Sequence, residues 1–331
     1  MMRGVLSPDV IREAETHWMR SGRAVVSGGP PGSATRADGC LLFLSAPFRA
    51  TLGGMSAAPA DRLVRYLVDG VAHHGLERGE HLVRLDGAPW EGGRATGARD
   101  PLSAPRLAPC TPGKIVCIGL NYLEHVKESL TVARPAPSAA GSPAASDAPA
   151  PPAEPLFFFK PATAVLAPGG AIVKPRGLTR LDPEGEVALV IGHRARHVSE
   201  AAALDHVAGV TAFNDVSARD WQKSDSQWSR AKGSDTFAPF GPCVALGLDP
   251  RDLAFDLAVN GNVRQRARTS EMHFGPAFLV HYVSRFITLE PGDVIATGTP
   301  AGIAPIEPGD SVAVTVEGVG TLVNPVVAEP A

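Results

Sequence analysis

Three carboxylates in this 331-residue chain have types and spacing that indicate chemistry. Two of them, Glu184 and Glu186, stand two residues apart at the start of an apolar, β-branched run that ends at Gly192. Because side chains on a strand alternate between its faces, a strand here would direct both carboxylates to the same side. Two adjacent anions repel each other unless water solvates both, they share a proton, or a cation lies between them.

The third acid, Asp215, ends a second apolar run that begins at Val207. Three carboxylates suit a hard divalent ion, because such ions prefer oxygen ligands and this set leaves coordination positions open. The alternative is that Glu184 and Glu186 form a solvated strand edge, as most isolated Glu-x-Glu pairs do. We predict a metal site formed by Glu184, Glu186 and Asp215.

The composition favours a globular protein that acts on small molecules. The chain is 44% hydrophobic and 20% charged, and its net charge of -3 gives no reason to expect nucleic acid or an anionic membrane as a partner. No apolar run approaches the length of a membrane span, and the N-terminal residues lack the pattern of a signal peptide. The four cysteines show no Cys-x-x-Cys spacing and are interpreted as buried thiols in a reducing cytosol, which predicts a cytoplasmic protein.

The chain is expected to form an α+β, predominantly β fold with a small unit before the main domain. Residues 1–54 are interpreted as an N-terminal extension that is either flexible or precedes a working chain that begins near Met55. Residues 55–110 are predicted to form a small β domain with strands at 63–68 and 80–86, and residues 111–331 the catalytic domain. In that domain the patterns predict strands at 112–119, 255–259, 294–297 and 311–316, and helices at 199–205 and 277–286, with order resuming at 156–160 after the loop.

A short polar helix is expected after the first strand of the catalytic domain. His125 and Glu128 stand three residues apart there and would share one helical face. They would serve either as a catalytic pair or as an ordinary surface contact worth about 0.2–0.5 kcal/mol. Residues 129–154 are rich in Pro, Ala and Ser and contain no aromatic residue. This segment is therefore predicted to be a mobile lid loop.

Five motifs, in order along the chain, resemble the fumarylacetoacetate hydrolase superfamily, in particular bacterial members of the acylpyruvate hydrolase or hydroxyheptadienedioate isomerase type. The resemblance covers roughly residues 62–327 and rests on segments 114–125, 184–186, 214–222, 232–242 and 291–300. It implies a mixed β-sandwich roll, a bound Mg²⁺ or Mn²⁺, a homodimer, and a small 2-oxo or 2,4-dioxo acid as substrate. The loop after Glu128 is longer than is usual in the family, and residues 1–54 have no counterpart in it.

The same resemblance implies roles for individual residues. The three carboxylates become the metal ligands, His125 with Glu128 resembles the catalytic dyad on a lid segment, and Lys232 corresponds to the lysine that faces the bound acid. The residues implied at the substrate are Gln222, Thr297 and Tyr122. Arg219 and Asp220 are interpreted as a structural ion pair beside the site.

These residues permit hydrolysis of a C–C bond. A 2-oxo acid can chelate a divalent ion, which polarises the keto group and stabilises the enolate left when a neighbouring C–C bond breaks. His125 would activate water with Glu128 fixing its tautomer, and Lys232 would offset developing negative charge. The leading hypothesis is a Mg²⁺-dependent hydrolase of a 2,4-diketo acid of the acylpyruvate or fumarylpyruvate type, in catabolism of aromatic or related compounds. The alternatives are a decarboxylase or isomerase of 2-oxo or 2-hydroxymuconate-type diacids on the same site, and a non-catalytic metal-binding scaffold.

Overall fold

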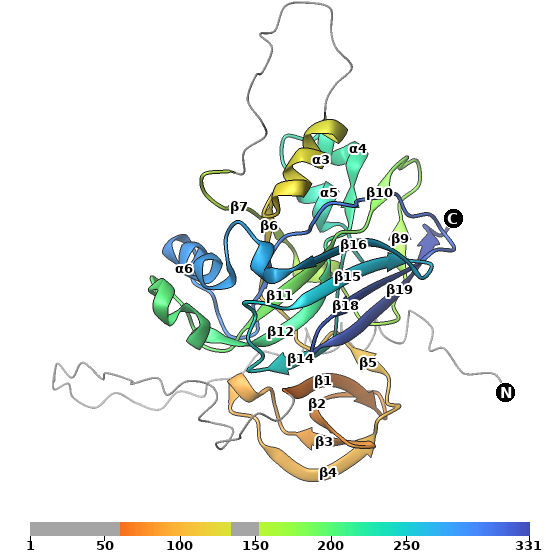
Figure 1. Cartoon of the computed structure of the whole chain (residues 1–331). Helices are drawn as coiled ribbons and strands as arrows, with labels where there is room; N and C mark the ends of the chain where they lie inside the picture. Colours follow the sequence, from red (N-terminus) through yellow and green to blue (C-terminus); the bar gives the residue numbers. More distant parts are fainter. Residues whose placement is uncertain (1–59, 134–151) are drawn as a thin grey trace, which may run out of the picture.

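The structure, a computed structural model, describes residues 60–133 and 152–331. The expected N-terminal extension, residues 1–54, lies outside the described residues, as do residues 134–151 of the expected lid loop. Strands predominate in the described chain (Figure 1), which confirms the α+β, predominantly β fold class.

Nineteen strands are assigned within the described residues. Those before the first carboxylate are β1 (Asp61–Val68), β2 (Val71–Arg78), β3 (His81–Leu85), β4 (Ala95–Pro101), β5 (Arg106–Leu107), β6 (Ile115–Gly119), β7 (Leu156–Lys160), β8 (Val165–Leu166), β9 (Ile172–Lys174) and β10 (Leu181–Asp182). Those that follow are β11 (Gly185–Ile191), β12 (Val207–Asn214), β13 (Ser217–Ala218), β14 (Ala238–Leu246), β15 (Ala254–Val259), β16 (Asn262–Arg268), β17 (Val294–Ala296), β18 (Ser311–Val316) and β19 (Gly320–Ala328). The strands expected in the catalytic domain correspond to β6, β15, β17 and β18, and the segment at 156–160, where order was expected to resume, forms β7.

Most strands belong to two sheets that pack on each other (Figure 1). The larger sheet has the order β4-β3-β2-β1-β14-β12-β11-β17-β6-β7, with β5 paired to β1 and β8 to β14. The smaller sheet has the order β16-β15-β18-β19-β9, and three of its strands contact the centre of the larger sheet. A short separate pair joins β10 to β13. This arrangement agrees with the expected sandwich.

Helices are few and short in the described residues. The α-helices are α3 (Leu123–Ala133), α4 (Arg219–Ser224), α5 (Ser229–Gly233) and α6 (Pro276–Phe286). The 3-10 helices are η1 (Pro89–Glu91), η2 (Ala162–Ala164), η3 (Glu200–His206) and η4 (Thr269–Glu271). The helices expected at 199–205 and 277–286 correspond to η3 and α6, which pack against each other. None of these described helices has the length and apolar character needed to cross a membrane.

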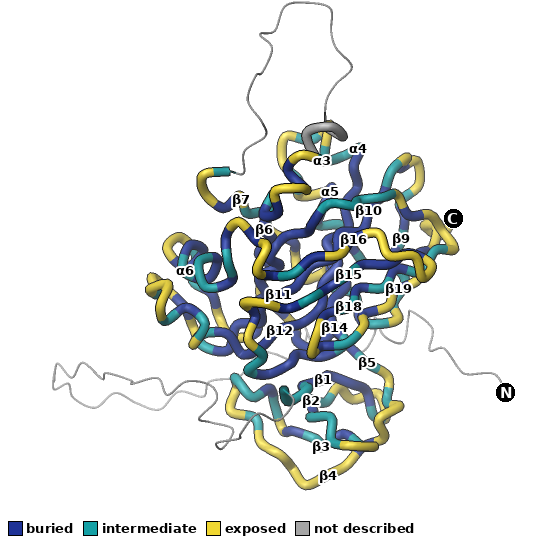
Figure 2. The backbone as a smooth tube through the Cα atoms, viewed as in Figure 1, coloured by how far each residue is buried: buried dark blue, intermediate teal, exposed yellow. Residues whose placement is uncertain are grey.

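Strands β11 and β12 form the buried centre of the molecule (Figure 2). Every residue of both strands is buried, because protein covers each face of the larger sheet here. Val187 packs in the core shared with the smaller sheet, whereas Ala188 and Val190 pack in a second core on the opposite face. The continuous apolar runs in the sequence are what such a doubly covered strand requires. By strand alternation, Glu186 lies on the same face as Ala188.

The N-terminal strands continue the larger sheet. β1, β2, β3 and β4 pair in chain order as an antiparallel meander, and β1 pairs with β14 at Asp61–Leu246 and two further positions. The strands expected at 63–68 and 80–86 correspond to β1 and β3.

The lid loop was expected to begin at Ser129, and this start is wrong because α3 continues to Ala133. Residues 129–133 read Ser-Leu-Thr-Val-Ala and contain neither glycine nor proline, so nothing local stops the helix. Pro135 follows shortly afterwards, and proline disfavours helical conformation in the residue before it. The absence of a local breaker explains why α3 includes residues 129–133.

Candidate metal centre and active site

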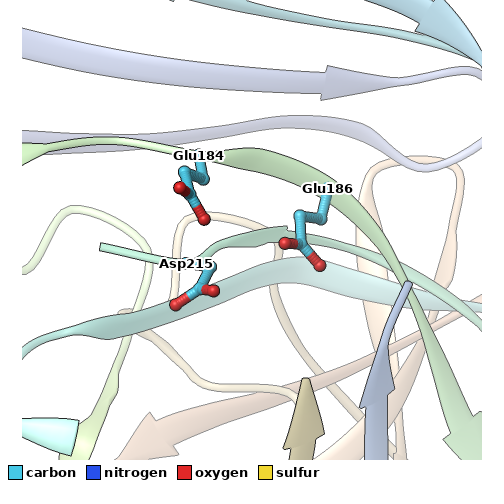
Figure 3. A group of neighbouring side chains, drawn as sticks. All are labelled: Glu184, Glu186 and Asp215. Carbon is cyan, nitrogen blue, oxygen red and sulfur yellow. The ribbon is translucent and has the colours of Figure 1, made fainter. Parts of the chain in front are cut away.

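The structure brings together the three carboxylates predicted to bind a metal (Figure 3). Glu184 immediately precedes β11, Glu186 lies in β11, and Asp215 immediately follows β12. Antiparallel pairing places Glu184 opposite Asp215, whose backbone N–H donates to the Glu184 carbonyl at 2.8 Å. One carboxylate oxygen from each residue lies within 4.8 Å of the others, and all three side chains are buried. This geometry can hold a divalent cation.

One carboxylate oxygen of Asp215 lacks a hydrogen-bond donor among the described residues. Asp215 Oδ1 is buried and accepts no hydrogen bond, although Lys160 Nζ lies 2.7 Å away as an ion pair. Lys160 donates instead to the backbone carbonyls of Val216, Lys232 and Phe237. A buried carboxylate oxygen without a donor has a lone pair available to a hard cation. The residues present therefore fit a metal such as Mg²⁺ or Mn²⁺.

Buried cations neutralise the carboxylate of Glu184. Lys232 Nζ donates to Glu184 Oε2 at 2.8 Å and to Asp215 Oδ2 at 2.7 Å, and Arg219 Nη2 donates to Glu184 Oε1 at 2.5 Å. Burial alone would raise the pKa of Glu184, but Lys232 and Arg219 hold that pKa below its ordinary range. Glu184 is therefore ionised at neutral pH. The structure thus places Lys232 directly on two of the three carboxylates.

Glu186 has the opposite electrostatic environment. Its Oε2 accepts a hydrogen bond from the Gly298 N–H at 2.8 Å, and no ion pair joins Glu186 to any residue in 60–133 or 152–331. Burial, followed by the charges of Asp215 and Glu184, raises the pKa of Glu186 well above 4.5. Positive charge added near Glu186 would therefore stabilise its ionised form.

Without metal, the wild-type protein should lose stability relative to the Glu186→Gln variant as pH rises. The carboxyl of Glu186 ionises near 4.5 in the unfolded chain and at a higher pH in the folded chain. Folding therefore takes up a proton between these two pKa values, so the free energy of unfolding falls as pH rises through that interval. Thermal unfolding of both proteins in EDTA, from about pH 5 to about pH 8, measures the difference. A difference that does not change with pH would contradict the raised pKa.

The expected catalytic pair lies beside the carboxylates. His125 is 6% exposed, its Nδ1 lies 3.5 Å from Glu128 Oε2, and its charge acts to lower the pKa of Glu184. Glu128 also accepts from the backbone N–H of Gly302 at 3.1 Å and from that of Ile303 at 3.5 Å. Burial would raise the pKa of Glu128, but the bonds from His125 and these amides keep it below its ordinary value. An ionised Glu128 can orient the imidazole and stabilise its protonated form.

The interpretation of Arg219 and Asp220 as an ion pair is wrong. Arg219 pairs with Glu184, as described above, while Asp220 accepts hydrogen bonds from the backbone N–H and the hydroxyl of Thr179. Adjacent residues on a helix point in different directions, so the two side chains of α4 diverge. Gln222 Oε1 accepts from Arg219 Nη1 at 2.8 Å, which places Gln222 one contact away from Glu184.

Two other residues implied at the substrate use their hydroxyl groups within the protein. Thr297 Oγ1 donates to the Val187 carbonyl at 2.7 Å, and its side chain is fully buried. Tyr122 is 3% exposed, and its hydroxyl donates to the Arg268 carbonyl at 3.4 Å. These contacts give Thr297 and Tyr122 structural roles, and their contact with substrate stays a prediction.

Several buried polar side chains around the site were not expected there. Asn214 Oδ1 accepts from the Glu184 N–H at 3.0 Å. Asp182 Oδ2 accepts from Arg219 Nε at 2.9 Å. The others are Lys160, Asn121 and Gln265. Lys160 offered one signal in the sequence, since it is a charged residue at the end of the apolar run Leu-Phe-Phe-Phe. Buried charges are rare unless paired.

The site thus consists of three buried carboxylates at the centre of a β sandwich with a histidine–carboxylate pair beside them. Residues 114–327 match the family described as fumarylacetoacetate hydrolase C-terminal, and residues 61–109 match the family described as Rv2993c-like, N-terminal. The chain therefore belongs to the fumarylacetoacetate hydrolase family.

Individual relatives support this assignment. The chain is 46% identical over 236 residues to the protein Rv2993c of Mycobacterium tuberculosis, which covers 70% of this chain and 82% of that protein. It is 38% identical over 234 residues to the mitochondrial oxaloacetate tautomerase FAHD2A of Homo sapiens, covering 67% of this chain and 69% of that one. The structure of 2-hydroxyhepta-2,4-diene-1,7-dioate isomerase from Mycobacterium marinum is similar with a TM-score of 0.71 and 40% identity, covering 82% of this chain and 100% of that chain. Both relatives with a named activity are enzymes.

Proposed function

We propose that this protein is a Mg²⁺- or Mn²⁺-dependent hydrolase that cleaves a C–C bond in a 2,4-diketo acid of the acylpyruvate or fumarylpyruvate type. The observation that carries the proposal is the buried group of Glu184, Glu186 and Asp215 with the pair His125–Glu128 beside it. A divalent cation held by these carboxylates would supply Lewis-acid charge that offsets negative charge on the 2-oxo group.

The charge balance of the site supports an anionic substrate. The four buried carboxylates around the site carry four negative charges when ionised, and the four basic side chains that pair with three of them carry four positive charges. The acids are Asp182, Glu184, Glu186 and Asp215, and the bases are Lys160, Arg180, Arg219 and Lys232. A dication added to this neutral set leaves two positive charges in a buried site. A doubly charged acid would restore neutrality.

In this mechanism His125 acts on water. His125 takes a proton from water as the oxygen adds to the distal carbonyl of the diketo acid, and Glu128 stabilises the resulting imidazolium. The C–C bond between that carbonyl and the neighbouring carbon then breaks, and its electron pair goes to the 2-oxo fragment. The protonated His125 can return its proton to that fragment. Lys232 offsets the developing negative charge. The products are a carboxylic acid and pyruvate or a related 2-oxo acid.

A second candidate function is isomerisation or tautomerisation of a 2-oxo diacid. It is favoured by the similarity to an oxaloacetate tautomerase and to a heptadienedioate isomerase. This reaction moves a proton without adding water across a C–C bond, so it needs the three carboxylates but not water activation by His125. Decarboxylation of a 2-oxo diacid would use the same carboxylates and release CO₂.

Turnover of a panel of acylpyruvates and 2-oxo diacids, with Mg²⁺, with Mn²⁺ and with EDTA, tests the proposal. Three readouts are followed separately: pyruvate release, CO₂ release and the change in enol absorbance. Metal-dependent pyruvate release without CO₂ is the expected result. An absorbance change alone would favour the isomerase, CO₂ release the decarboxylase, and no reaction on any 2-oxo acid a metal-binding scaffold.

Assembly as a homodimer is part of the proposal. β7 forms one edge of the larger sheet, and its Leu156 and Phe159 are 41% and 43% exposed. An edge strand with exposed apolar side chains is a suitable surface for a second copy of the chain. The mass in solution, measured by light scattering, tests this assembly. Location in the cytoplasm stays a prediction; Cys110, Cys117 and Cys243 are buried free thiols, and Cys40 lies outside the described residues.

A further inference from the structure

Gly185, the residue between Glu184 and Glu186, lies opposite Asn214 of β12, but its backbone N–H and carbonyl bond to side chains on the β17 side. β17 pairs with β11 from Ala188 to Val190, and the Thr297 N–H extends this pairing to the Val187 carbonyl. Backbone groups two residues apart on a strand point to the same side, so those of Gly185 also point toward β17. The segment after Thr297 no longer pairs with β11 opposite Gly185. The Gly185 N–H and carbonyl therefore need other partners.

Gln265 and Thr299 supply these partners. Gln265 Oε1 accepts from the Gly185 N–H at 2.8 Å, and Thr299 Oγ1 donates to the Gly185 carbonyl at 3.0 Å. Gln265 Nε2 also donates to Thr299 Oγ1 at 2.8 Å and to the Pro300 carbonyl at 2.7 Å. Gln265 is 1% exposed and Thr299 is 3% exposed, so solvent does not readily replace a lost bond. We call Gln265 and Thr299 the Gly185 clamp.

The smaller sheet holds Gly185 from a further direction. A Cβ atom on Gly185 would lie 2.8 Å from Leu257 Cβ in β15, closer than real side chains approach. β15 therefore packs directly on the backbone of Gly185, and only glycine fits there. Packing and the clamp together leave this peptide segment little freedom to rotate.

We propose that Gln265 and Thr299 are positioning residues that set the separation of the Glu184 and Glu186 carboxylates. The proposal rests on the metal site of the proposed function. Both carboxylates extend from residues bonded to Gly185, so a change in backbone angles at Gly185 would change the distance between their oxygen atoms. Mg²⁺ and Mn²⁺ sites tolerate little such change, because short metal–oxygen distances are required. Partners behind metal ligands typically contribute 10- to 100-fold in metal affinity.

Calorimetric titration of the full chain with Mn²⁺ tests the Gly185 clamp. Gln265→Met and Thr299→Val, which replace polar groups with apolar groups of similar size, should each weaken Mn²⁺ binding about 10- to 100-fold. Thr299→Ser keeps the hydroxyl and should bind Mn²⁺ as the wild type does. The double variant should lose less affinity than the two single losses multiplied together, because both residues act on one peptide.

Asn324→Leu is the matched control. Asn324 is a buried amide in β19 that donates to the carbonyls of Ala167 and Gly170, and β19 does not neighbour β16, the strand of Gln265, in the smaller sheet. This variant should lose stability in urea while keeping wild-type Mn²⁺ affinity. An equal loss of Mn²⁺ affinity in Asn324→Leu would assign the effect to general destabilisation and overturn the proposal.

The remaining outcomes separate this proposal from the metal site itself. If the wild type binds Mn²⁺ and a folded Gln265→Met variant binds it equally well, the clamp has no positioning role. If the wild type binds no Mn²⁺, the metal site is wrong and the clamp falls with it. If Gln265→Met lacks the wild-type circular dichroism spectrum, Thr299→Val decides, since it exchanges only a hydroxyl for a methyl group.

Discussion

Asp215→Asn should lower turnover by about 1,000-fold or more and remove measurable Mn²⁺ binding. A Lewis-acid metal supplies several kcal/mol of transition-state stabilisation, and each 1.36 kcal/mol corresponds to a tenfold change in rate. The substitution removes one of three metal-binding charges. Lys160 Nζ and Lys232 Nζ each lie 2.7 Å from a carboxylate oxygen of Asp215. In the variant, the amide NH₂ group would face one of these ammonium groups, so two hydrogen-bond donors would meet. The effect is measured by calorimetric Mn²⁺ titration and by initial rates at saturating metal.

Asp100→Asn is the control for loss of a buried, paired carboxylate. Asp100 is 7% exposed, accepts from Tyr66 at 2.7 Å and from Arg84 at 2.6 Å, and lies in β4 at the far edge of the larger sheet. This variant should be less stable but should keep Mn²⁺ affinity and turnover. Undiminished Mn²⁺ binding by a folded Asp215→Asn protein would show that the three carboxylates are not the metal site.

His125→Ala should reduce hydrolysis about 100- to 10,000-fold while leaving metal-dependent tautomerisation of the same acids partly intact. The range is that for loss of a general base from a positioned side chain. Tautomerisation needs charge stabilisation by the metal site, which this substitution does not remove. Pyruvate release and enol absorbance, followed in the same reaction, separate the two activities. Added imidazole should restore part of the hydrolysis, because it can enter the space left by the ring and accept a proton.

His281→Ala serves as the control histidine variant. His281 lies in α6, and its Nδ1 bonds to the backbone carbonyl of Val198, so its loss should leave both activities near wild type. Full hydrolytic activity in His125→Ala would overturn the role assigned to His125. Equal loss of hydrolysis and tautomerisation would instead indicate that His125 supports the metal site as a whole.

The convergence of the carboxylates could be predicted because it depends on local rules. Period-two alternation puts Glu184 and Glu186 on one side, and the end of the next apolar run supplies Asp215. The antiparallel pairing of β11 with β12 then brings these residues together. The same local rules located β1, β3 and α6. They missed β2, where Val-Ala-His-His-Gly gives no clear alternation of apolar and polar residues.

The supporting polar residues depend on contacts distant in sequence, which no local pattern reveals. Lys160 binds carbonyls 56 to 77 positions away in the chain, so its inward direction follows from the packing of α5 on β7. Gln265 did leave a signal that was not used. In the segment 264–268, Arg-Gln-Arg-Ala-Arg, the arginines occupy one face of β16 and Gln265 shares the buried face with Ala267. A polar side chain at an apolar position of a strand indicates a specific buried partner.

The pairing of β1 with β14 gives the small N-terminal unit a protective function. Without it, the flank of β14 from Val244 to Leu246 would expose unsatisfied amide and carbonyl groups beside the fully buried strand β12. A bare flank of this kind recruits strands from other chains and leads to aggregation. A shortened form of this protein that starts after residue 110 would need another segment to pair with this flank of β14, even if its catalytic residues are unchanged.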